Sequence, residues 1–158
     1  MRIIGIDPGT AILGFGVIDS IKGLQPVLVD AGVIRTPSDQ SDGQRLATIY
    51  SELTNIIKEN KPEIIVVEKL FFAQNVTTAM TVSQARGVVL LVGERANLEL
   101  FEYTPLQIKQ ALTGYGRAEK KQIQEMVRVI LKLKEVPKPD DCADALAAAI
   151  MHSMIASS

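Results

Sequence analysis

Cysteine and histidine are almost absent from this sequence, in which Cys142 and His152 are the only residues of their kinds. A single cysteine cannot form an intramolecular disulfide, so a disulfide-stapled secreted domain is excluded and a reducing compartment is favoured. The same scarcity excludes the usual zinc and iron–sulfur sites, which need several cysteines or histidines. If a metal binds to this chain, carboxylates must hold it.

Long apolar segments are also missing. The most apolar run, residues 87–93, is much shorter than the roughly 20 residues that a membrane-spanning helix requires. At the N-terminus, Asp7 and Pro8 interrupt the chain before the apolar region of a signal peptide could develop. We therefore expect a cytoplasmic protein with no membrane partner.

The remaining composition is typical of a soluble globular protein. The chain has 158 residues, of which 47% are hydrophobic and 22% charged, and it shows no internal repeat, low-complexity tract or linker. A chain of this length can bury one sizeable core. We predict a single domain over residues 1–158.

Charge is unevenly distributed along the chain, although the net charge is only −1. Between Gln107 and Lys138, eight basic residues outnumber three acidic ones, so this stretch carries +5 and the rest of the chain −6. Such asymmetry is typical of a surface that binds a polyanion. The alternative is an ordinary solvated helix surface, which the charge pattern alone does not exclude.

Hydrophobic periodicity predicts secondary structure in the order βββαβαβααα. Apolar and β-branched runs predict strands over residues 2–7, 14–19, 24–35, 63–68 and 97–103. Helices are expected over residues 46–57, 76–96, 106–112, 119–133 and 141–156. The short connections of the first three strands favour an antiparallel meander, and the continuous apolar strand 63–68 is typical of the middle of a mixed sheet. The order predicts an α/β domain with a five-stranded mixed sheet flanked by helices.

Carboxylates follow the two most apolar strands. Asp7 ends the run Ile3–Ile6, and Glu68 ends the run Ile64–Val67. Ligands of α/β sheets bind beyond the carboxyl ends of strands, so neighbouring strands would bring both acids to one edge. There they would repel each other unless one is protonated or a cation lies between them. The alternative is that each is a solvated acid at the end of a strand.

A second pair of acids opens the last predicted helix. Asp141 and Asp144 are three residues apart and share one helix face. Acids are also normal in the first turn of a helix, so capping by itself explains this pair. The mostly small residues 145–149 would, however, let the helix pack closely against the strands of Asp7 and Glu68.

Four carboxylates without a histidine are the ligand set of a hard cation. Mg²⁺ and Mn²⁺ prefer oxygen ligands, and Mg²⁺ is commonly bound by a few carboxylates, water and phosphate oxygens. Two divalent ions would neutralise four acids and could clamp the attacking and leaving oxygens of a phosphodiester. The pattern therefore favours a metal-dependent reaction on a phosphodiester.

Several short motifs occur along nearly the whole chain, up to about His152. They are Ile6-Asp7-Pro-Gly-Thr10, Val67-Glu68-Lys-Leu-Phe71, Gln84-Ala-Arg-Gly87, Lys109-Gln110, Ala118-Glu-Lys120 and Asp141-Cys-Ala-Asp144-Ala-Leu. In this order and spacing, the set resembles the RuvC family of Holliday junction resolvases, which have the RNase H-like fold. The first motif alone is less specific, because a D-x-G-T sequence also occurs in the phosphate loops of actin-like ATPases.

The resemblance implies an active site, a reaction and partners. It implies that Asp7, Glu68, Asp141 and Asp144 are a catalytic tetrad that binds two Mg²⁺ ions, for which Mn²⁺ substitutes. It implies paired symmetric nicks in a four-way DNA junction, with 5′-phosphate and 3′-hydroxyl ends, made by a homodimer in recombination and DNA repair. A branch-migration helicase complex of the RuvA–RuvB type is the further partner that it implies.

Residues near the DNA also follow from the resemblance. Lys109 and Lys120 match lysines near the scissile phosphate, where a cation stabilises developing negative charge. Phe71 matches an aromatic residue that stacks on bases, and the adjacent Phe72 cannot enter the same core; the alternative is that Phe71 is an apolar anchor. The other expected DNA contacts are Arg86, Arg117 and Lys121.

Three features allow two interpretations. The spacing D-x-x-D-A-L selects Asp141 as the metal ligand, although Asp140 directly precedes it. The loop 113–117 is either a mobile segment near DNA or a turn between helices. The helix 76–96 is apolar nearly all round, which suits burial against the sheet and a second subunit, or the core of a monomer.

The leading hypothesis is a structure-selective endonuclease that cuts four-way DNA junctions. One alternative is another RNase H-like nuclease that acts on structured RNA. A second alternative is a non-catalytic junction-binding protein, which the complete set of acids disfavours. An actin-like phosphotransferase would need a second phosphate loop, which the sequence lacks.

Overall fold

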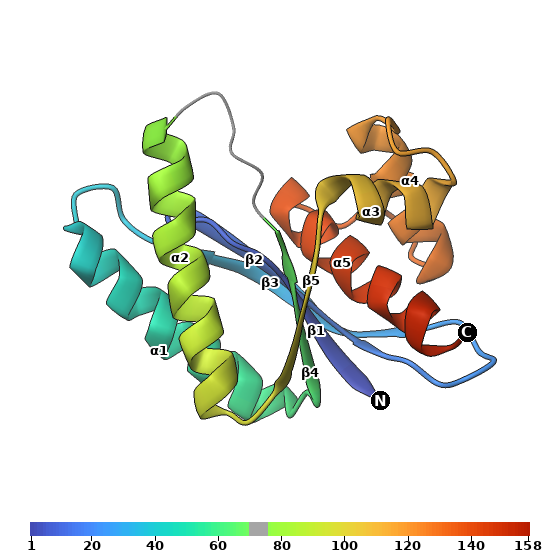
Figure 1. The fold of residues 1–158 in the computed structure, drawn as a ribbon, viewed down its shortest axis with the longest axis horizontal. Coiled ribbons are helices and arrows are strands. Elements are labelled where there is room, and N and C mark those ends of the chain that lie inside the picture. The colour runs from blue at the N-terminus through green and yellow to red at the C-terminus, as the bar shows by residue number, and fades with distance from the viewer. Residues whose placement is uncertain (70–75) are drawn as a thin grey trace.

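The computed structural model describes residues 1–69 and 76–158. Figure 1 labels the strands and helices that these residues form. They are β1 (Arg2–Asp7), β2 (Ile12–Asp19), β3 (Val27–Arg35), α1 (Asp42–Asn60), β4 (Ile64–Glu68), α2 (Val76–Arg95), β5 (Glu99–Tyr103), α3 (Pro105–Thr113), α4 (Lys120–Ile130) and α5 (Asp140–Ala156).

The strands form one mixed sheet in the order β3-β2-β1-β4-β5. Antiparallel pairing joins β1 to β2 and β2 to β3, which confirms the predicted meander. Parallel pairing joins β4 to β1 on one side and to β5 on the other. The apolar strand β4 is therefore internal, as predicted, and the expected α/β architecture is confirmed.

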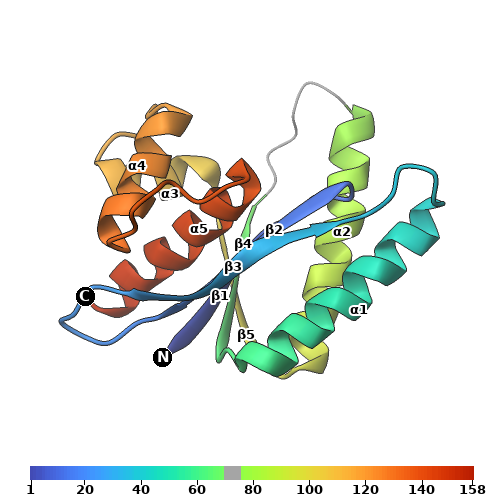
Figure 2. The ribbon, with the colours of Figure 1, turned by 180° about the vertical axis from the view of Figure 1, so that it is seen from behind.

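Helices cover both faces of the sheet. Figures 1 and 2 show α1 and α2 on one face and α3, α4 and α5 on the other. Because side chains alternate along a strand, β1 supplies Ile3 to the core beneath α5 and Ile4 to the core beneath α1 and α2. Both side chains are fully buried.

Helix α5 lies in direct backbone contact with the sheet. A Cβ atom on Gly5 would stand 2.0 Å from the carbonyl oxygen of Ala145, and one on Gly14 would stand 2.1 Å from that of Asp141. Only glycine fits at these two positions, since real Cβ atoms do not approach oxygen so closely. The close packing that the small residues of α5 predicted therefore depends equally on glycines of β1 and β2.

Several boundaries differ from those predicted. Helix α1 begins earlier, at Asp42, because Ser41 and Gln44 form a capping box that supplies hydrogen bonds to its first turn. Helix α4 ends earlier, at Ile130, and Lys132 beyond it has the left-handed φ of 54°, which an α-helix cannot continue through. Strand β3 begins later, at Val27, beyond the turn that follows Ile21.

Helix α2 has two different faces. Its length and apolar composition alone would allow it to cross a membrane, and no other helix among residues 1–69 and 76–158 meets that criterion. One face, including Ala85 and Val89, is buried in the core with the sheet and α1. The other exposes Met80 and Leu91, by 61% and 51%.

Candidate active site

The carboxyl ends of β1 and β4 bring Asp7 and Glu68 together. The two strands are parallel and Ile6 pairs with Val67, so the acids that follow these residues lie side by side. The charge of Glu68 raises the pKa of Asp7, as expected for two adjacent carboxyl groups. They are not the solvated strand-end acids of the alternative interpretation.

The N-terminal turn of α5 adds two more acids to the same edge of the sheet. The glycine contacts described above hold this helix against β1 and β2, which places Asp141 and Asp144 near the ends of those strands. Pro139 occupies the N-cap position and makes no side-chain capping hydrogen bond. Neither aspartate is therefore the N-cap residue, although Asp141 lies in the first turn, where an acid also suits the helix dipole.

Burial and repulsion from neighbouring acids disfavour the charged forms of Asp7, Glu68 and Asp144. Burial, followed by the charges of Glu68, Asp144 and Asp141, raises the pKa of Asp7 to about 8. Burial and the charge of Asp144 raise the pKa of Glu68 to about 7. The pKa of Asp144 is also raised, mainly by burial. The protein therefore concentrates more negative charge here than it compensates.

The structure distinguishes Asp141 from the adjacent Asp140. The Asp140 carboxylate accepts a hydrogen bond from Gln124 Nε2 at 2.9 Å and lies 3.3 Å from Lys120 Nζ, so it faces α4. Asp141, by contrast, is one of the acids whose charge raises the pKa of Asp7. This arrangement favours Asp141 as the fourth member of the cluster.

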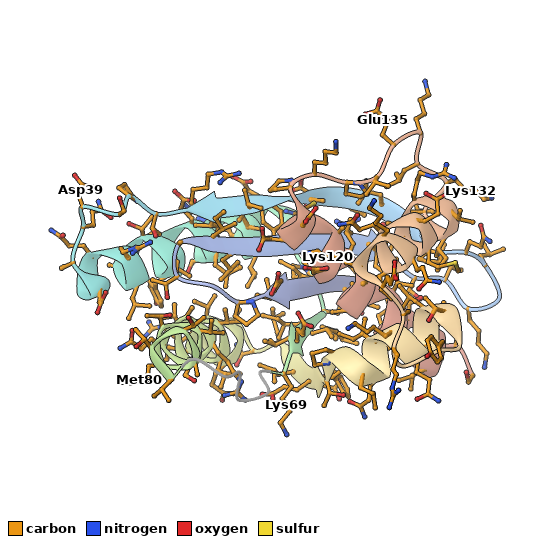
Figure 3. All side chains as sticks on the ribbon, turned by 90° about the horizontal axis from the view of Figure 1, so that it is seen from above. Asp39, Lys69, Met80, Lys120, Lys132 and Glu135 are labelled. Carbon is orange, nitrogen blue, oxygen red and sulfur yellow. The ribbon has the colours of Figure 1, made fainter. Side chains whose placement is uncertain are left out.

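Two lysines lie beside the acids. Lys120 Nζ is 3.6 Å from Asp144 Oδ2, and the charge of Lys109 lowers the pKa of Glu68 against the larger effect of burial. A cavity of about 200 Å³ is lined by both lysines together with Glu68 and Asp144. Figure 3 looks onto this edge of the molecule and shows Lys120 near its centre.

The donor set suits divalent cations. The half-buried acids carry charges that Lys120 and Lys109 do not balance, and carboxylate oxygen is the ligand that Mg²⁺ and Mn²⁺ prefer. In the part of the chain that the structure describes, no three acidic, histidine or cysteine side chains converge closely enough to chelate one ion. The acids are thus within electrostatic range of one another but stand wider than a closed chelate.

The remaining residues that we expected to touch DNA lie in different surroundings. Arg86 of α2 forms an ion pair with Glu102 of β5, in which both side chains are less than one-third exposed. Arg117 and Lys121 are exposed on the α4 side of the molecule. Phe71 and Phe72 lie outside the described residues.

His152, near the end of α5, is a structural residue and is not solvated. The side chain is buried, and its Nδ1 atom lies 2.7 Å from the hydroxyl of Tyr103 in β5. Burial lowers the pKa of this imidazole, so the neutral form is favoured. His152 follows Asp144 by eight residues, a spacing that places both residues on one side of the helix.

Comparison with known proteins decides the family. The family model described as crossover junction endodeoxyribonuclease RuvC matches residues 3–152. The chain belongs to the RuvC family. A relative from Heliobacterium modesticaldum with that name is 56% identical over 98% of this chain and 96% of its own length. One from Caldicellulosiruptor saccharolyticus is 49% identical over 100% of this chain and 95% of its own.

Solved RuvC structures have the same fold. Thermus thermophilus RuvC in complex with a Holliday junction substrate superposes with a TM-score of 0.94 at 37% identity, over 99% of this chain and 95% of that one. The yeast mitochondrial Holliday junction resolvase superposes with a TM-score of 0.69 at 15% identity, over 96% of this chain and 78% of its own. The latter similarity concerns the fold alone.

Proposed function

We propose that this chain is a structure-selective endonuclease that resolves four-way DNA junctions through Asp7, Glu68, Asp141 and Asp144. One observation carries this proposal: half-buried acids from three separate elements lie near one another at the carboxyl edge of the sheet, beside two lysines. Membership of the RuvC family supports the substrate, since the relatives carry the name crossover junction endodeoxyribonuclease.

Two Mg²⁺ ions, or Mn²⁺ in their place, fit the charge of the four acids. When bound, they would activate water for attack on the phosphodiester and stabilise the leaving 3′-oxygen. The ions would also replace the protons that the raised pKa values of Asp7 and Glu68 retain near neutral pH. The protein's own contribution is to hold the acids at one edge of a rigid sheet.

The two lysines have separate contributions. Lys120, 3.6 Å from Asp144, would neutralise charge that develops on the scissile phosphate. Lys109 lines the same cavity beside Glu68 and would contact the phosphate from α3. The exposed Arg117 and Lys121 extend the positive surface away from the cavity and would contact the DNA backbone, whose phosphates supply most of the binding energy.

A homodimer would cover the exposed face of α2. Met80, Gln84, Gly87 and Leu91 follow one another at four-, three- and four-residue steps and therefore form one stripe along the helix. A Cβ atom on Gly87 would meet no neighbour within 4 Å, so a helix from a second subunit could approach closely there. Two subunits would supply the two active sites that paired nicks require.

The contact of Arg86, Phe71 and Phe72 with DNA stays a prediction. The same holds for a helicase complex of the RuvA–RuvB type and for the cytoplasmic location. Each of them comes from the family resemblance and from composition.

Cleavage of a mobile synthetic four-way junction with Mg²⁺ tests the proposed function. Linear duplex DNA and forked RNA are the comparison substrates, and Asp7→Asn is compared with Asp39→Asn, the same chemical change on an exposed loop. We expect symmetric nicks in opposed strands from the wild type and from Asp39→Asn. We expect Asp7→Asn to bind the junction without cutting it, since loss of a negative charge does not weaken phosphate binding.

Three results would contradict the proposal. Preferential cutting of RNA would favour the RNA-processing alternative. Binding without cleavage by the wild type, at every Mg²⁺ and Mn²⁺ concentration, would favour a non-catalytic junction-binding protein. Loss of junction binding in Asp7→Asn would show that this aspartate supports the fold rather than the chemistry.

A further inference from the structure

The threonine that ends the motif Ile6-Asp-Pro-Gly-Thr10 is not exposed to substrate. Thr10 lies in the turn between β1 and β2, three residues after Asp7, and only 7% of it is exposed. Its hydroxyl donates a hydrogen bond of 2.7 Å to the carbonyl oxygen of Thr81 in α2. A hydroxyl that is buried and already donating is a poor phosphate ligand, so the role of this residue lies elsewhere.

The backbone of the same residue is held from the opposite side. The Thr10 carbonyl oxygen accepts a hydrogen bond of 2.6 Å from the Thr36 hydroxyl, which in turn accepts one of 2.8 Å from Arg45 Nε in α1. The Thr36 amide also donates to the carbonyl oxygen of Ala11 at 3.1 Å. Hydrogen bonds thus connect the turn to α2 through the Thr10 side chain, and to the start of α1 through the Thr10 carbonyl group, Thr36 and Arg45.

The turn between these fastenings is short. A Cβ atom on Gly9 would stand 2.3 Å from the carbonyl oxygen of Ile12, so the chain folds tightly back on itself between Asp7 and β2. Because the turn is tight, a displacement of the backbone at Thr10 would also displace Asp7. Asp7 is also the acid that the other carboxylates of the cluster repel.

We propose that Thr10 is a positioning residue, which holds Asp7 at the metal site through its hydrogen bond to α2. This inference rests on the proposed function, because it assigns Thr10 to the same active site. It predicts that loss of the hydroxyl weakens metal binding and slows the chemical step, while DNA binding, which depends on other residues, is retained.

The test compares Thr10→Val, which keeps the shape of the side chain but removes the donor, with Thr10→Ser, which keeps the donor. Affinity for Mn²⁺ is measured by isothermal titration calorimetry on the DNA-free protein. Single-turnover junction cleavage gives the rate of chemistry, and binding to the junction in EDTA gives the affinity for DNA. Thr54→Val is the matched control, because it removes a threonine-to-carbonyl hydrogen bond of 2.6 Å on the exposed surface of α1.

We expect Thr10→Val to bind Mn²⁺ about 10-fold more weakly and to cut about 10-fold more slowly, as outer-shell partners of metal ligands commonly do when removed. Junction affinity in EDTA should change less than about two-fold, and Thr10→Ser should restore both properties, because its hydroxyl makes a comparable hydrogen bond. If Thr10→Val does not fold, Thr36→Val tests the opposite fastening and should weaken Mn²⁺ binding in the same direction.

Wild-type affinity and rate in the valine variants would overturn the inference, as would a serine variant as impaired as Thr10→Val. If the wild type cuts the junction and the variants match it, only the role of Thr10 is refuted. If the wild type neither binds Mn²⁺ nor cuts, the proposed function fails and the inference fails with it.

Discussion

Replacing Asp7 by asparagine should stabilise the metal-free protein at neutral pH. The reason is the raised pKa of Asp7, about 8 in the folded protein against the ordinary aspartate value of 3.8. Between these values the folded state retains a proton that the unfolded state has released. The free energy of unfolding therefore falls as pH rises, by about 1.4 kcal/mol per pH unit for one proton.

The asparagine side chain does not titrate, so the variant lacks this dependence of stability on pH. From pH 5 to pH 7 the wild type should lose about 3 kcal/mol through Asp7 that the variant does not lose. Below about pH 3, where both states of the wild type are protonated at this position, the difference should vanish. For a chain of this size, 1 kcal/mol corresponds to about 2–4 °C in Tm.

Urea unfolding in EDTA at pH 4, 5, 6 and 7 measures this effect for the wild type, Asp7→Asn and Asp39→Asn. We expect the Asp7→Asn curve to diverge upward from the other two as pH rises. Addition of Mg²⁺ at pH 7 should stabilise the wild type and have little effect on Asp7→Asn. Parallel curves for all three proteins would refute the reasoning, because they would mean that the Asp7 carboxyl is solvated and unperturbed.

Three further predictions concern the surroundings of the acids. Lys120→Met should lower the single-turnover rate about 100-fold, the scale of one lost charge-stabilising contact in an active site, whereas Lys132→Met, on the exposed surface, should keep that rate. Gly14→Ala should lower the free energy of unfolding in urea by about 2 kcal/mol or more and abolish Mn²⁺ binding, because its Cβ would overlap the α5 backbone. Gly43→Ala, at a position with open space around it, should have neither effect. Equal stability of the two variants would contradict the direct contact between α5 and β2. Leu91→Glu should shift the protein from dimer to monomer in light scattering, since it buries a charge in the proposed interface, and an unchanged mass would exclude α2 as that interface.

The sequence was sufficient for those parts of the protein that depend on neighbours in the chain. Apolar runs that end on Asp7 and Glu68 predict two strands, because burial of a strand on both faces leaves a continuous apolar pattern. They also place the two acids at the carboxyl ends of those strands. The three-residue spacing of Asp141 and Asp144 likewise predicted a shared helix face from helical geometry alone. The order and spacing of the motifs then resembled those of a known family, which implied that these acids form one site.

The tertiary structure decided what depends on residues distant in the chain. Asp140 faces α4 because Lys120 and Gln124 meet it there, and neither partner is identifiable from the D-x-x-D spacing. The burial of Asp7, and hence its raised pKa, results from α5 lying on the glycines of β1 and β2. Thr10 is joined to Thr81 across 71 positions of sequence. Such contacts follow from how the layers pack, and no local propensity encodes which side chains the packing will bring together.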